Sequence, residues 1–287
     1  MTIWINGSLH KGHGPLIDTR DRGLLLADGV FETILIRDGK PVFLREHLER
    51  FRRAAEFFGI PLGYTDEKIN DALRKVVASH GPGNHDYACR ITLTRGVSQR
   101  GLVPPEKSQT LPTLVITAVM SAPVTQGQVV LSLSDICRNE GSPSSRYKTI
   151  AYTDNILARQ RALQEGAGDA LMCNNRGEVA CATAANIFLI LPGGKLVTPP
   201  REVGVLGGIA RGVVLDIAVS VFTDVREVVL RPDELGGGQL FLTNSLIGIQ
   251  LARMIGDTKQ ASGETRDLLL ELQKRYAQRI SDEIGGQ

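Results

Sequence analysis

The segment Ser144-Ser145-Arg146-Tyr147-Lys148-Thr149 determines how this chain is interpreted. An apolar, β-branched strand pattern precedes it at 129–136, and a helical pattern follows it at 155–163. We therefore expect Lys148 to face a cleft where a strand passes into a helix. A lysine amine, with a pKa of about 10.4, is a poor nucleophile at neutral pH unless burial or imine formation with an aldehyde cofactor activates it. A solvated surface lysine is the ordinary alternative, so other segments must decide.

The composition is that of an ordinary soluble globular protein. The chain has 287 residues, of which 42% are hydrophobic and 22% charged, and its net charge of +2 gives no reason to expect nucleic acid or an acidic membrane as partner. The four cysteines show no CxxC spacing, so we expect neither a metal site nor a disulfide framework. No signal pattern opens the chain and no apolar run could span a bilayer, so a cytoplasmic location is expected.

The first half of the chain combines strands and amphipathic helices in an order typical of α+β folds. The turn Asp38-Gly39 predicts a hairpin. The polar loop at 95–110, rich in Arg, Gly and Pro, is longer than a core connection requires and is expected to bind a ligand. The expected strands lie at 30–36, 42–44, 87–94 and 114–119, and the expected helices at 46–58 and 66–79.

The second half is richer in short strands. We expect a small N-terminal α/β domain at 1–120, an interdomain linker at 121–130 and a larger C-terminal mixed α/β domain at 131–287. Its expected strands lie at 170–173, 178–181, 187–191, 195–197, 225–230 and 239–243, and its expected helices begin at Gly207-Gly208 and Gly263.

Three features are able to form a phosphate site together with Lys148. Gly207-Gly208 opens a helix, whose free backbone N–H groups attract an anion. The guanidinium of Arg50 can hold a phosphate with two hydrogen bonds. Hydroxyls of Thr243-Asn244-Ser245 follow a strand and can donate to phosphate oxygens. Each feature also has an ordinary reading, as a turn, a solvated arginine or a cap of the next turn.

The order and spacing of these motifs resemble the class IV, fold-type IV pyridoxal-phosphate aminotransferases. This family includes D-amino-acid and branched-chain transaminases and aminodeoxychorismate lyase. The resemblance covers nearly the whole chain and implies a two-domain α+β enzyme with a C-terminal domain that binds pyridoxal 5′-phosphate. It rests on Asp21-Arg22-Gly23, 27–32, 47–51, 93–96, 145–149, 185–188, 198–200 and 207–211.

The resemblance implies roles at individual positions. Lys148 would form the internal aldimine, a Schiff base with the cofactor, and carry the proton between the substrate Cα and C4′. Arg50 would bind the cofactor phosphate, together with the backbone N–H groups of Ile209 and Ala210 and the hydroxyl of Ser245.

The resemblance also implies how substrate is held. Phe31 and Thr33 would line the substrate pocket, and Arg100 would trap a carboxylate. In the family, the loop that carries this arginine reaches into the neighbouring subunit, so a homodimer is implied. Leu102 stands where some D-amino-acid transaminases place a histidine that assists the trap.

One departure concerns the cofactor ring. The family usually has a glutamate that pairs with the pyridine nitrogen, and here Cys181 occupies that position, followed by Ala182. Both are expected to contact the cofactor, but a thiol is a weak donor and no strong anion. Ala151 and Thr153 also replace the Asn and Leu that are common after the lysine.

The main hypothesis is transamination between an amino acid, of L or D configuration, or an amine and a 2-keto acid through the Lys148 aldimine. The first alternative is aminodeoxychorismate lyase, which forms 4-aminobenzoate and pyruvate with the same cofactor. The second is a catalytically weakened homologue that only binds pyridoxal phosphate. Cys181, in place of the usual glutamate, is the reason to consider it.

Overall fold

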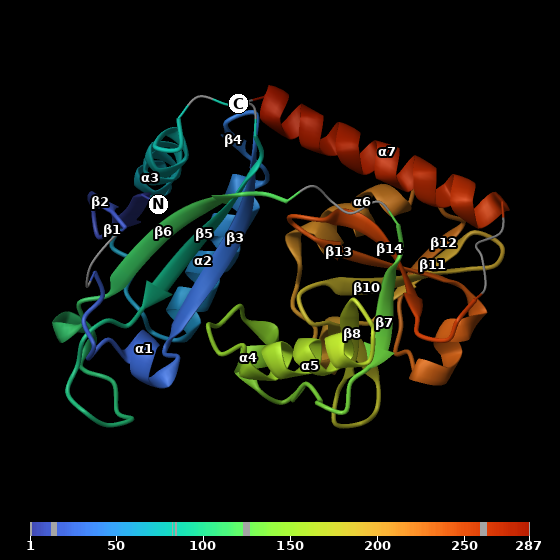
Figure 1. Cartoon of the computed structure of the whole chain (residues 1–287), viewed down its shortest axis with the longest axis horizontal. Helices are drawn as coiled ribbons and strands as arrows, with labels where there is room; N and C mark the ends of the chain where they lie inside the picture. Colours follow the sequence, from blue (N-terminus) through green and yellow to red (C-terminus); the bar gives the residue numbers. More distant parts are fainter. Residues whose placement is uncertain are drawn as a thin grey trace. The chain divides into compact units, whose positions relative to one another are not determined.

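The computed structural model describes residues 2–12, 16–81, 83, 85–122, 127–258 and 263–286 (Figure 1). The chain divides into two compact units. The first unit comprises Met1–Ala122, Tyr147–Ala151 and Glu283–Gln287, and the second comprises Pro123–Arg146 and Tyr152–Asp282. Part of the expected linker, at 123–126, lies outside the described residues.

The first unit is built on an antiparallel six-stranded sheet of order β2-β1-β6-β5-β3-β4. Its longest pairings join β3 to β5 and β5 to β6, so β5 lies in the middle of the sheet. The strands are β1 (Thr2–Ile5), β2 (Ser8–Lys11), β3 (Gly29–Arg37), β4 (Lys40–Pro41), β5 (Tyr87–Thr94) and β6 (Thr113–Met120), and the helices are α1 (Arg22–Leu26), α2 (Leu44–Phe57), α3 (Asp66–Ala78) and the 3-10 turn η1 (Lys107–Gln109).

Two helices, α2 and α3, pack on one face of this sheet. The inward side chains of α2 and α3, such as Phe51 and Leu73, share a core with alternate residues of the strands, such as Ile34 and Ile91. Because successive strand residues point to opposite faces, the intervening residues of β3 and β5 lie on the other face. The Thr65 hydroxyl caps α3 by accepting from the backbone N–H of Lys68.

The prediction of a return strand at 42–44 was wrong. The return strand is β4, at Lys40–Pro41, and Leu44 is already the first residue of α2. The backbone N–H of Val42 still donates to the Leu35 carbonyl at 2.8 Å. Phe43 then adopts a left-handed conformation with φ of 54°, which turns the chain out of the strand and into the helix.

The second unit contains a mixed eight-stranded sheet of order β12-β11-β10-β13-β14-β7-β8-β9. Stacked rings of Phe188 and Phe241, with centroids 4.9 Å apart, join the neighbouring strands β10 and β13. The strands are β7 (Val129–Leu133), β8 (Asp169–Cys173), β9 (Val179–Ala182), β10 (Asn186–Leu191), β11 (Lys195–Thr198), β12 (Asp224–Glu227), β13 (Gln239–Asn244) and β14 (Gly248–Met254). The helices are α4 (Pro143–Arg146), α5 (Thr153–Gln164), α6 (Ile209–Ala218) and α7 (Gly263–Gly285), the last of which enters the first unit from Glu283 onward, with 3-10 turns η2 (Arg201–Val203) and η3 (Pro232–Gly237).

The structure confirms the α+β class. Most predicted elements are present within a few residues, but the strand expected at 225–230 is shorter, ending at Glu227, and the one expected at 129–136 ends at Leu133. The strands β1, β2 and β14 and the helices α1 and α4 were not predicted from the sequence. Among the described residues, no helix is both long and apolar enough to cross a membrane.

Candidate active site

Lys148 lies in a short segment that extends the first unit's sheet along the edge of β3. The Phe31 N–H donates to the Lys148 carbonyl at 2.9 Å, and Val30 forms an isolated bridge with Thr149. Gly29 lies tightly between this segment and β5, because a Cβ there would lie 3.0 Å from Ile150 Cδ1 and 2.7 Å from the Leu93 carbonyl oxygen. The Lys148 ammonium lies 4.3 Å from the centroid of the Phe31 ring, a cation–π distance.

The neighbouring tyrosine anchors this segment. The Tyr147 ring stacks on Phe57 with centroids 4.3 Å apart and meets Phe58 edge to face at 5.6 Å. Both phenylalanines lie at the end of α2, so the helix fixes the backbone from which Lys148 projects. The residues before and after the half-buried Lys148, Tyr147 and Thr149, both contact the first unit and so fix the position of the lysine backbone.

Arg50 is held by a buried carboxylate on β3. Glu32 Oε1 accepts from Arg50 Nε at 2.7 Å, and Oε2 accepts from Arg50 Nη2 at 2.8 Å. His47 Nδ1 lies 2.8 Å from the same Oε2. Burial raises the pKa of Glu32, but the charges of Arg50 and His47 outweigh burial and hold that pKa well below its usual range. The Arg50 side chain is therefore oriented by an ionised carboxylate.

Glu32 and His47 were missed as site residues, although the sequence contains a signal for them. Glu32 occupies a core-facing position of β3 between the apolar Val30 and Ile34. A carboxylate in such a position requires a buried partner. His47 and Arg50, three residues apart on α2, share one helix face and supply it.

The loop after β5 carries Arg100 and Leu102, both exposed in the structure. Its base is fixed by Asp28, which accepts from Arg22 Nε and from Arg95 Nε, each at 2.7 Å. Arg22 also donates to the Leu102 carbonyl at 3.1 Å. These arginines hold the pKa of Asp28 below its usual range despite its burial. Among the described residues of the first unit, no contact joins Arg100 to Lys148.

In the second unit, the start of α6 forms a cradle for an anion. Gly208 is the N-cap residue of α6, and no side chain caps this helix start. The backbone N–H groups of Ile209 and Ala210 therefore stand at the positive end of the helix dipole without a side-chain acceptor. A Cβ at Gly208 would lie 2.1 Å from Asn186 Oδ1, so a larger residue would have to displace that side chain. Asn186 pairs across the sheet with Thr243.

Thr243 adds a hydroxyl to this cradle. Its Oγ1 is fully buried and makes no hydrogen bond with any described residue. A buried hydroxyl without a partner is costly, and a bound oxyanion would satisfy it. A helix start without a side-chain cap, a glycine packed against Asn186 and an unsatisfied hydroxyl therefore suit the phosphate of a cofactor.

The half-buried Ser245 follows Asn244 at the end of β13. Asn244 caps the turn, since its Oδ1 accepts from the N–H groups of Leu246 and Ile247, each at 2.9 Å. Its Nδ2 donates to the Ala184 carbonyl at 3.1 Å, just after β9. The capping function that the sequence left open for Thr243 and Ser245 therefore falls to Asn244.

Cys181 and Ala182 lie on the buried strand β9. Burial raises the pKa of the Cys181 thiol, and the Asp169 carboxylate acts in the same direction against the Arg138 guanidinium. The thiol is therefore neutral near pH 7. Glu178 does not replace the missing carboxylate, because its Oε2 is held by the adjacent turn; its donors there are Asn174 Nδ2 at 2.6 Å and Arg176 Nη2 at 2.7 Å.

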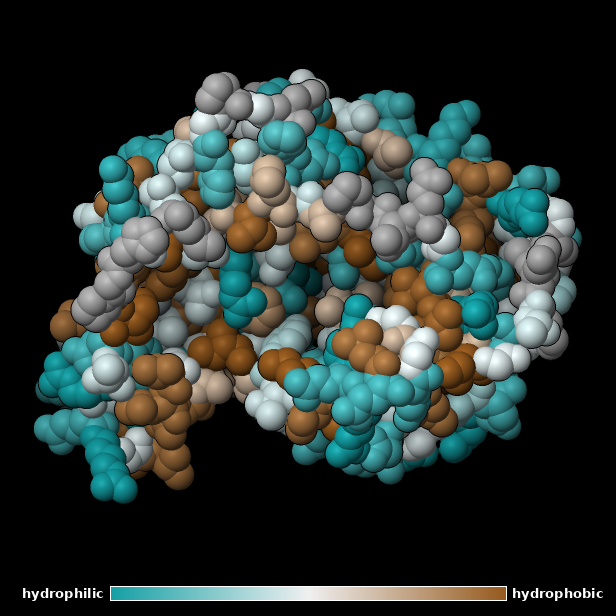
Figure 2. Space-filling view, in the orientation of Figure 1, coloured by the Kyte–Doolittle hydropathy of each residue, from teal (hydrophilic) through white to brown (hydrophobic). Residues whose placement is uncertain are grey.

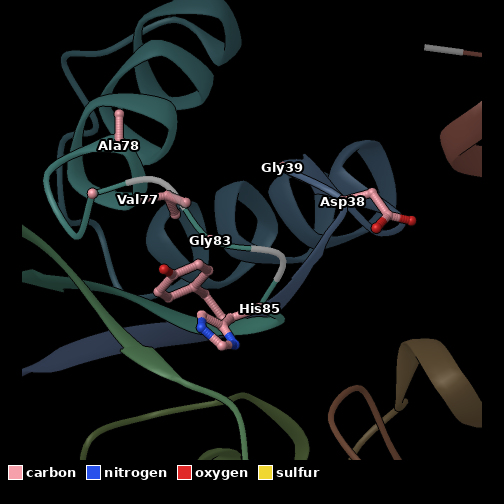
Figure 3. Close-up of a pocket in the computed structure, with 8 residues that line it drawn as sticks. Asp38, Gly39, Val77, Ala78, Gly83 and His85 are labelled. Carbon is pink, nitrogen blue, oxygen red and sulfur yellow. The ribbon is translucent and has the colours of Figure 1, made fainter.

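The predicted site residues are divided between the two units. Lys148, Phe31, Thr33, Arg50, Arg100 and Leu102 belong to the first unit; Cys181, Ala182, Ile209, Ala210 and Ser245 belong to the second. A cavity of about 340 Å³ lies at the opposite end of β3 from Phe31, and none of the predicted site residues lines it (Figure 3). Its lining residues are Asp38, Gly39, Val77, Ala78, Gly81, Gly83, His85 and Tyr87.

Comparisons with known proteins identify the family of this chain. The family of class IV amino-transferases matches residues 29–255. D-alanine aminotransferase of Listeria monocytogenes is 25% identical over 99% of this chain and 98% of its own length. Aminodeoxychorismate lyase of Bacillus subtilis is 24% identical over 99% and 97%.

A solved structure shows the same fold. Branched-chain aminotransferase of the thermophilic archaeon Thermoproteus uzoniensis, solved with norvaline, superimposes with a TM-score of 0.87 at 23% identity, covering 99% of this chain and 97% of that one. The family match spans most of the chain, including Lys148, Arg50 and the start of α6. The chain therefore belongs to the class IV aminotransferase family, whose members use pyridoxal 5′-phosphate as cofactor.

Proposed function

We propose that this protein transfers an amino group between an amino acid and a 2-keto acid, with Lys148 as the catalytic residue. The observation that carries the proposal is the placement of Lys148: its backbone is paired to β3, and its ammonium lies beside the Phe31 ring. Arg50, held by Glu32 on the same strand, supplies a pre-oriented guanidinium for the cofactor phosphate.

Bound pyridoxal 5′-phosphate would supply an aldehyde for the amino donor and an electron sink for the bond broken at Cα. The Lys148 amine would take the proton from the substrate Cα and deliver it on the same face, at C4′. The Phe31 ring lies beside this amine, with its centroid 4.3 Å from Nζ. In the second unit, the N–H groups of Ile209 and Ala210 and the hydroxyls of Thr243 and Ser245 would bind the phosphate.

Cys181 would stand at the pyridine nitrogen, where it cannot act as an anion. A neutral thiol leaves that nitrogen without a carboxylate partner, so the ring would be a weaker electron sink. We therefore expect a slower proton transfer at Lys148 than in relatives with the usual glutamate.

The function is tested with the purified protein loaded with pyridoxal 5′-phosphate. D-alanine, L-leucine and other amino donors are each incubated with 2-oxoglutarate, and the new amino acid is measured. Transfer from at least one donor is expected. No transfer from any donor, with an absorbance spectrum that none of them changes, would favour the weakened homologue.

The lyase is the second candidate function. The full-length similarity to aminodeoxychorismate lyase, at 24% identity, is nearly as high as the 25% shared with D-alanine aminotransferase. Aminodeoxychorismate is therefore included as a substrate without any keto acid. Release of pyruvate under these conditions would overturn the transaminase proposal.

We also propose a homodimer in a reducing compartment such as the cytoplasm. An apolar surface, defined by Leu24, Leu25 and Leu26 of α1 with Leu102 and Val103, is exposed; Leu102 and Val103 are 81% and 86% exposed. Figure 2 shows brown side chains gathered where α1 lies in Figure 1. Patches of this kind mark protein interfaces. All four cysteines are free, which supports the compartment.

Light scattering on a size-exclusion column tests the dimer. The wild type is expected to elute at twice the mass of the chain, and Leu25→Asp is expected to shift it toward the monomer. A monomeric wild type at micromolar concentration would refute this part of the proposal.

A further inference from the structure

Two cysteines that are distant in the sequence, Cys137 and Cys173, are neighbours in the second unit. Arg138 forms an isolated parallel bridge with Asn174, and its N–H donates to the Cys173 carbonyl at 2.8 Å. This bridge continues the parallel pairing of β7 with β8, which are adjacent in the sheet (Figure 1). The residues that precede a parallel bridge also lie next to each other, so Cys137 lies beside Cys173.

The spacing of two parallel strands suits a disulfide at this position. Neighbouring strands are about 4.8 Å apart, and the Cα atoms of a disulfide are usually about 4.4–6.8 Å apart. Paired residues of parallel strands point to the same face, so the two thiols share a side of the sheet. All four cysteines are free, so the pair is in its reduced form here.

The two thiols differ in their access to solvent. Cys137 is exposed, whereas Cys173 is buried. Burial, together with the neighbouring thiols of Cys137 and Cys181, raises the pKa of Cys173. Cys173 is therefore a neutral thiol near pH 7 and is shielded from solutes, while Cys137 can meet an oxidant directly.

Cys181 is a less suitable partner for Cys173. It pairs across β8 and β9 with Met172, the residue before Cys173, and a bulge in the pairing follows Met172. Successive strand residues point to opposite faces. In agreement, Cys173 packs in an apolar cluster with Val179, whereas Cys181 packs in another with Val203.

We propose that Cys137 and Cys173 are a redox-active thiol pair that hydrogen peroxide converts into a disulfide. The Cys137 thiolate attacks the peroxide: the S–O bond forms, the O–O bond breaks and hydroxide leaves, which gives a sulfenic acid. Cys173 attacks this sulfur; the S–S bond forms, the S–O bond breaks, and the thiol proton leaves with the hydroxide as water. Two thiols and one peroxide thus give one disulfide and two waters. Disulfides in reducing compartments are usually transient ones of this kind.

Arg138 connects this thiol pair to the candidate active site. Its guanidinium donates to the Ser145 carbonyl at 2.9 Å and to the Gly204 carbonyl at 3.0 Å. Ser145 precedes the segment that carries Lys148, and Gly204 precedes the glycines that open α6. Closure of the disulfide requires Cβ atoms about 3.5–4.5 Å apart, so it draws Cys137 and the adjacent arginine toward β8. Oxidation should therefore weaken cofactor binding, whichever reaction the protein catalyses.

Peptide mapping of the full-length protein tests the thiol pair. The reduced protein is treated with hydrogen peroxide, its remaining thiols are alkylated in denaturant, and a tryptic digest is analysed by mass spectrometry without reductant. We expect a cross-link between the Cys137 and Cys173 peptides of one chain, the loss of two of the four thiols, and their recovery with a phosphine reductant. A cross-link of Cys173 to Cys181, a cross-link of Cys137 to a second chain, or a Cys137 sulfinic acid beside a free Cys173 would each overturn the proposal.

Three variants assign the two roles. Cys137→Ser should lose the cross-link and keep its other three thiols. Cys173→Ser should leave Cys137 as a sulfenic acid that dimedone labels, because no thiol resolves it. Cys89→Ser, which removes a buried cysteine of the first unit, is the matched control and should keep the cross-link. Oxidation of Cys173 in Cys137→Ser would contradict the order of attack.

Cofactor binding tests the consequence of the disulfide. After removal of peroxide, the oxidised wild type is expected to bind pyridoxal 5′-phosphate roughly fivefold more weakly than the reduced protein in equilibrium dialysis, as for one lost hydrogen bond. The phosphine should restore the affinity, and peroxide should leave that of Cys137→Ser unchanged. Equal affinities of the two forms would overturn the link to the cofactor site, and the peptide map would still decide the thiol pair.

Discussion

The Glu32 carboxylate holds the Arg50 guanidinium with both of its oxygens, at 2.7 Å from Nε and 2.8 Å from Nη2. This pair joins β3 to α2 within the buried part of the first unit. An arginine that is positioned by such a pair loses less side-chain entropy when it binds a phosphate. In the proposed site, the pair would therefore link the stability of the first unit to cofactor affinity.

Glu32→Gln is expected to lower the free energy of unfolding at pH 7 by about 3–5 kcal/mol, because it breaks a buried ion pair. In the wild type, the pKa of Glu32 is lower in the folded than in the unfolded protein. The difference in free energy of unfolding between wild type and variant is therefore fully present above the unfolded pKa of about 4.3, and it is lost as the pH falls toward the folded pKa. Urea unfolding between pH 7 and pH 3 should show the two proteins converging at low pH.

The matched control for this experiment is Glu49→Gln, which removes an exposed pair with Arg53 on the same helix. We expect a change below about 1 kcal/mol. A difference between wild type and Glu32→Gln that stays constant down to pH 3 would contradict the assigned ionisation of Glu32.

Lys148→Ala is expected to abolish the visible absorbance band of the cofactor-loaded protein and to reduce transamination to background. The control Lys195→Ala, at an exposed position of β11, should keep both. A band retained in Lys148→Ala would mean that another lysine carries the cofactor.

Cys181→Glu is expected to raise kcat about tenfold, because a carboxylate would favour protonation of the pyridine nitrogen by one pKa unit or more. Single-turnover kinetics with a good donor measures the effect, and thermal unfolding checks that the buried glutamate is tolerated. A folded variant with a lower rate would show that the thiol suits the reaction of this enzyme.

Thr243→Val is expected to preserve or raise the stability of the cofactor-free protein but to weaken cofactor binding. It removes a buried hydroxyl that lacks a hydrogen bond with any described residue, so the cofactor-free protein should be equally or more stable. Cofactor affinity should fall about fivefold, in proportion to one lost hydrogen bond of about 1 kcal/mol. Equilibrium dialysis of the cofactor and thermal unfolding measure the two effects; unchanged affinity would exclude Thr243 from the phosphate site.

The sequence predicted the fold class and most elements because their signals are local. The helix at α3, for example, follows from the inward residues Ile69, Leu73 and Val76 at helical spacing. The start of α2 was missed because it depends on the left-handed Phe43, a conformation that no local motif requires. Lys148 and Arg50 were identified by motif, but their partners were not.

Those partners are set by tertiary pairing. Lys148 meets the Phe31 ring only through the pairing of its segment with β3, and Glu32 meets Arg50 only when α2 packs on the sheet. Neither relationship has a fixed spacing along the chain. A buried carboxylate in an apolar strand was the one available signal, and it indicated a partner without naming it.

The segment Tyr147–Ala151 belongs to the first unit, although the residues before and after it belong to the second. Exchange of residues 1–122 for those of a relative would therefore leave Lys148 paired with a foreign strand edge. Chimaeras of this family should keep their lysine segment together with its own β3. The boundary for recombination is thus set by strand pairing rather than by the linear order of the two units.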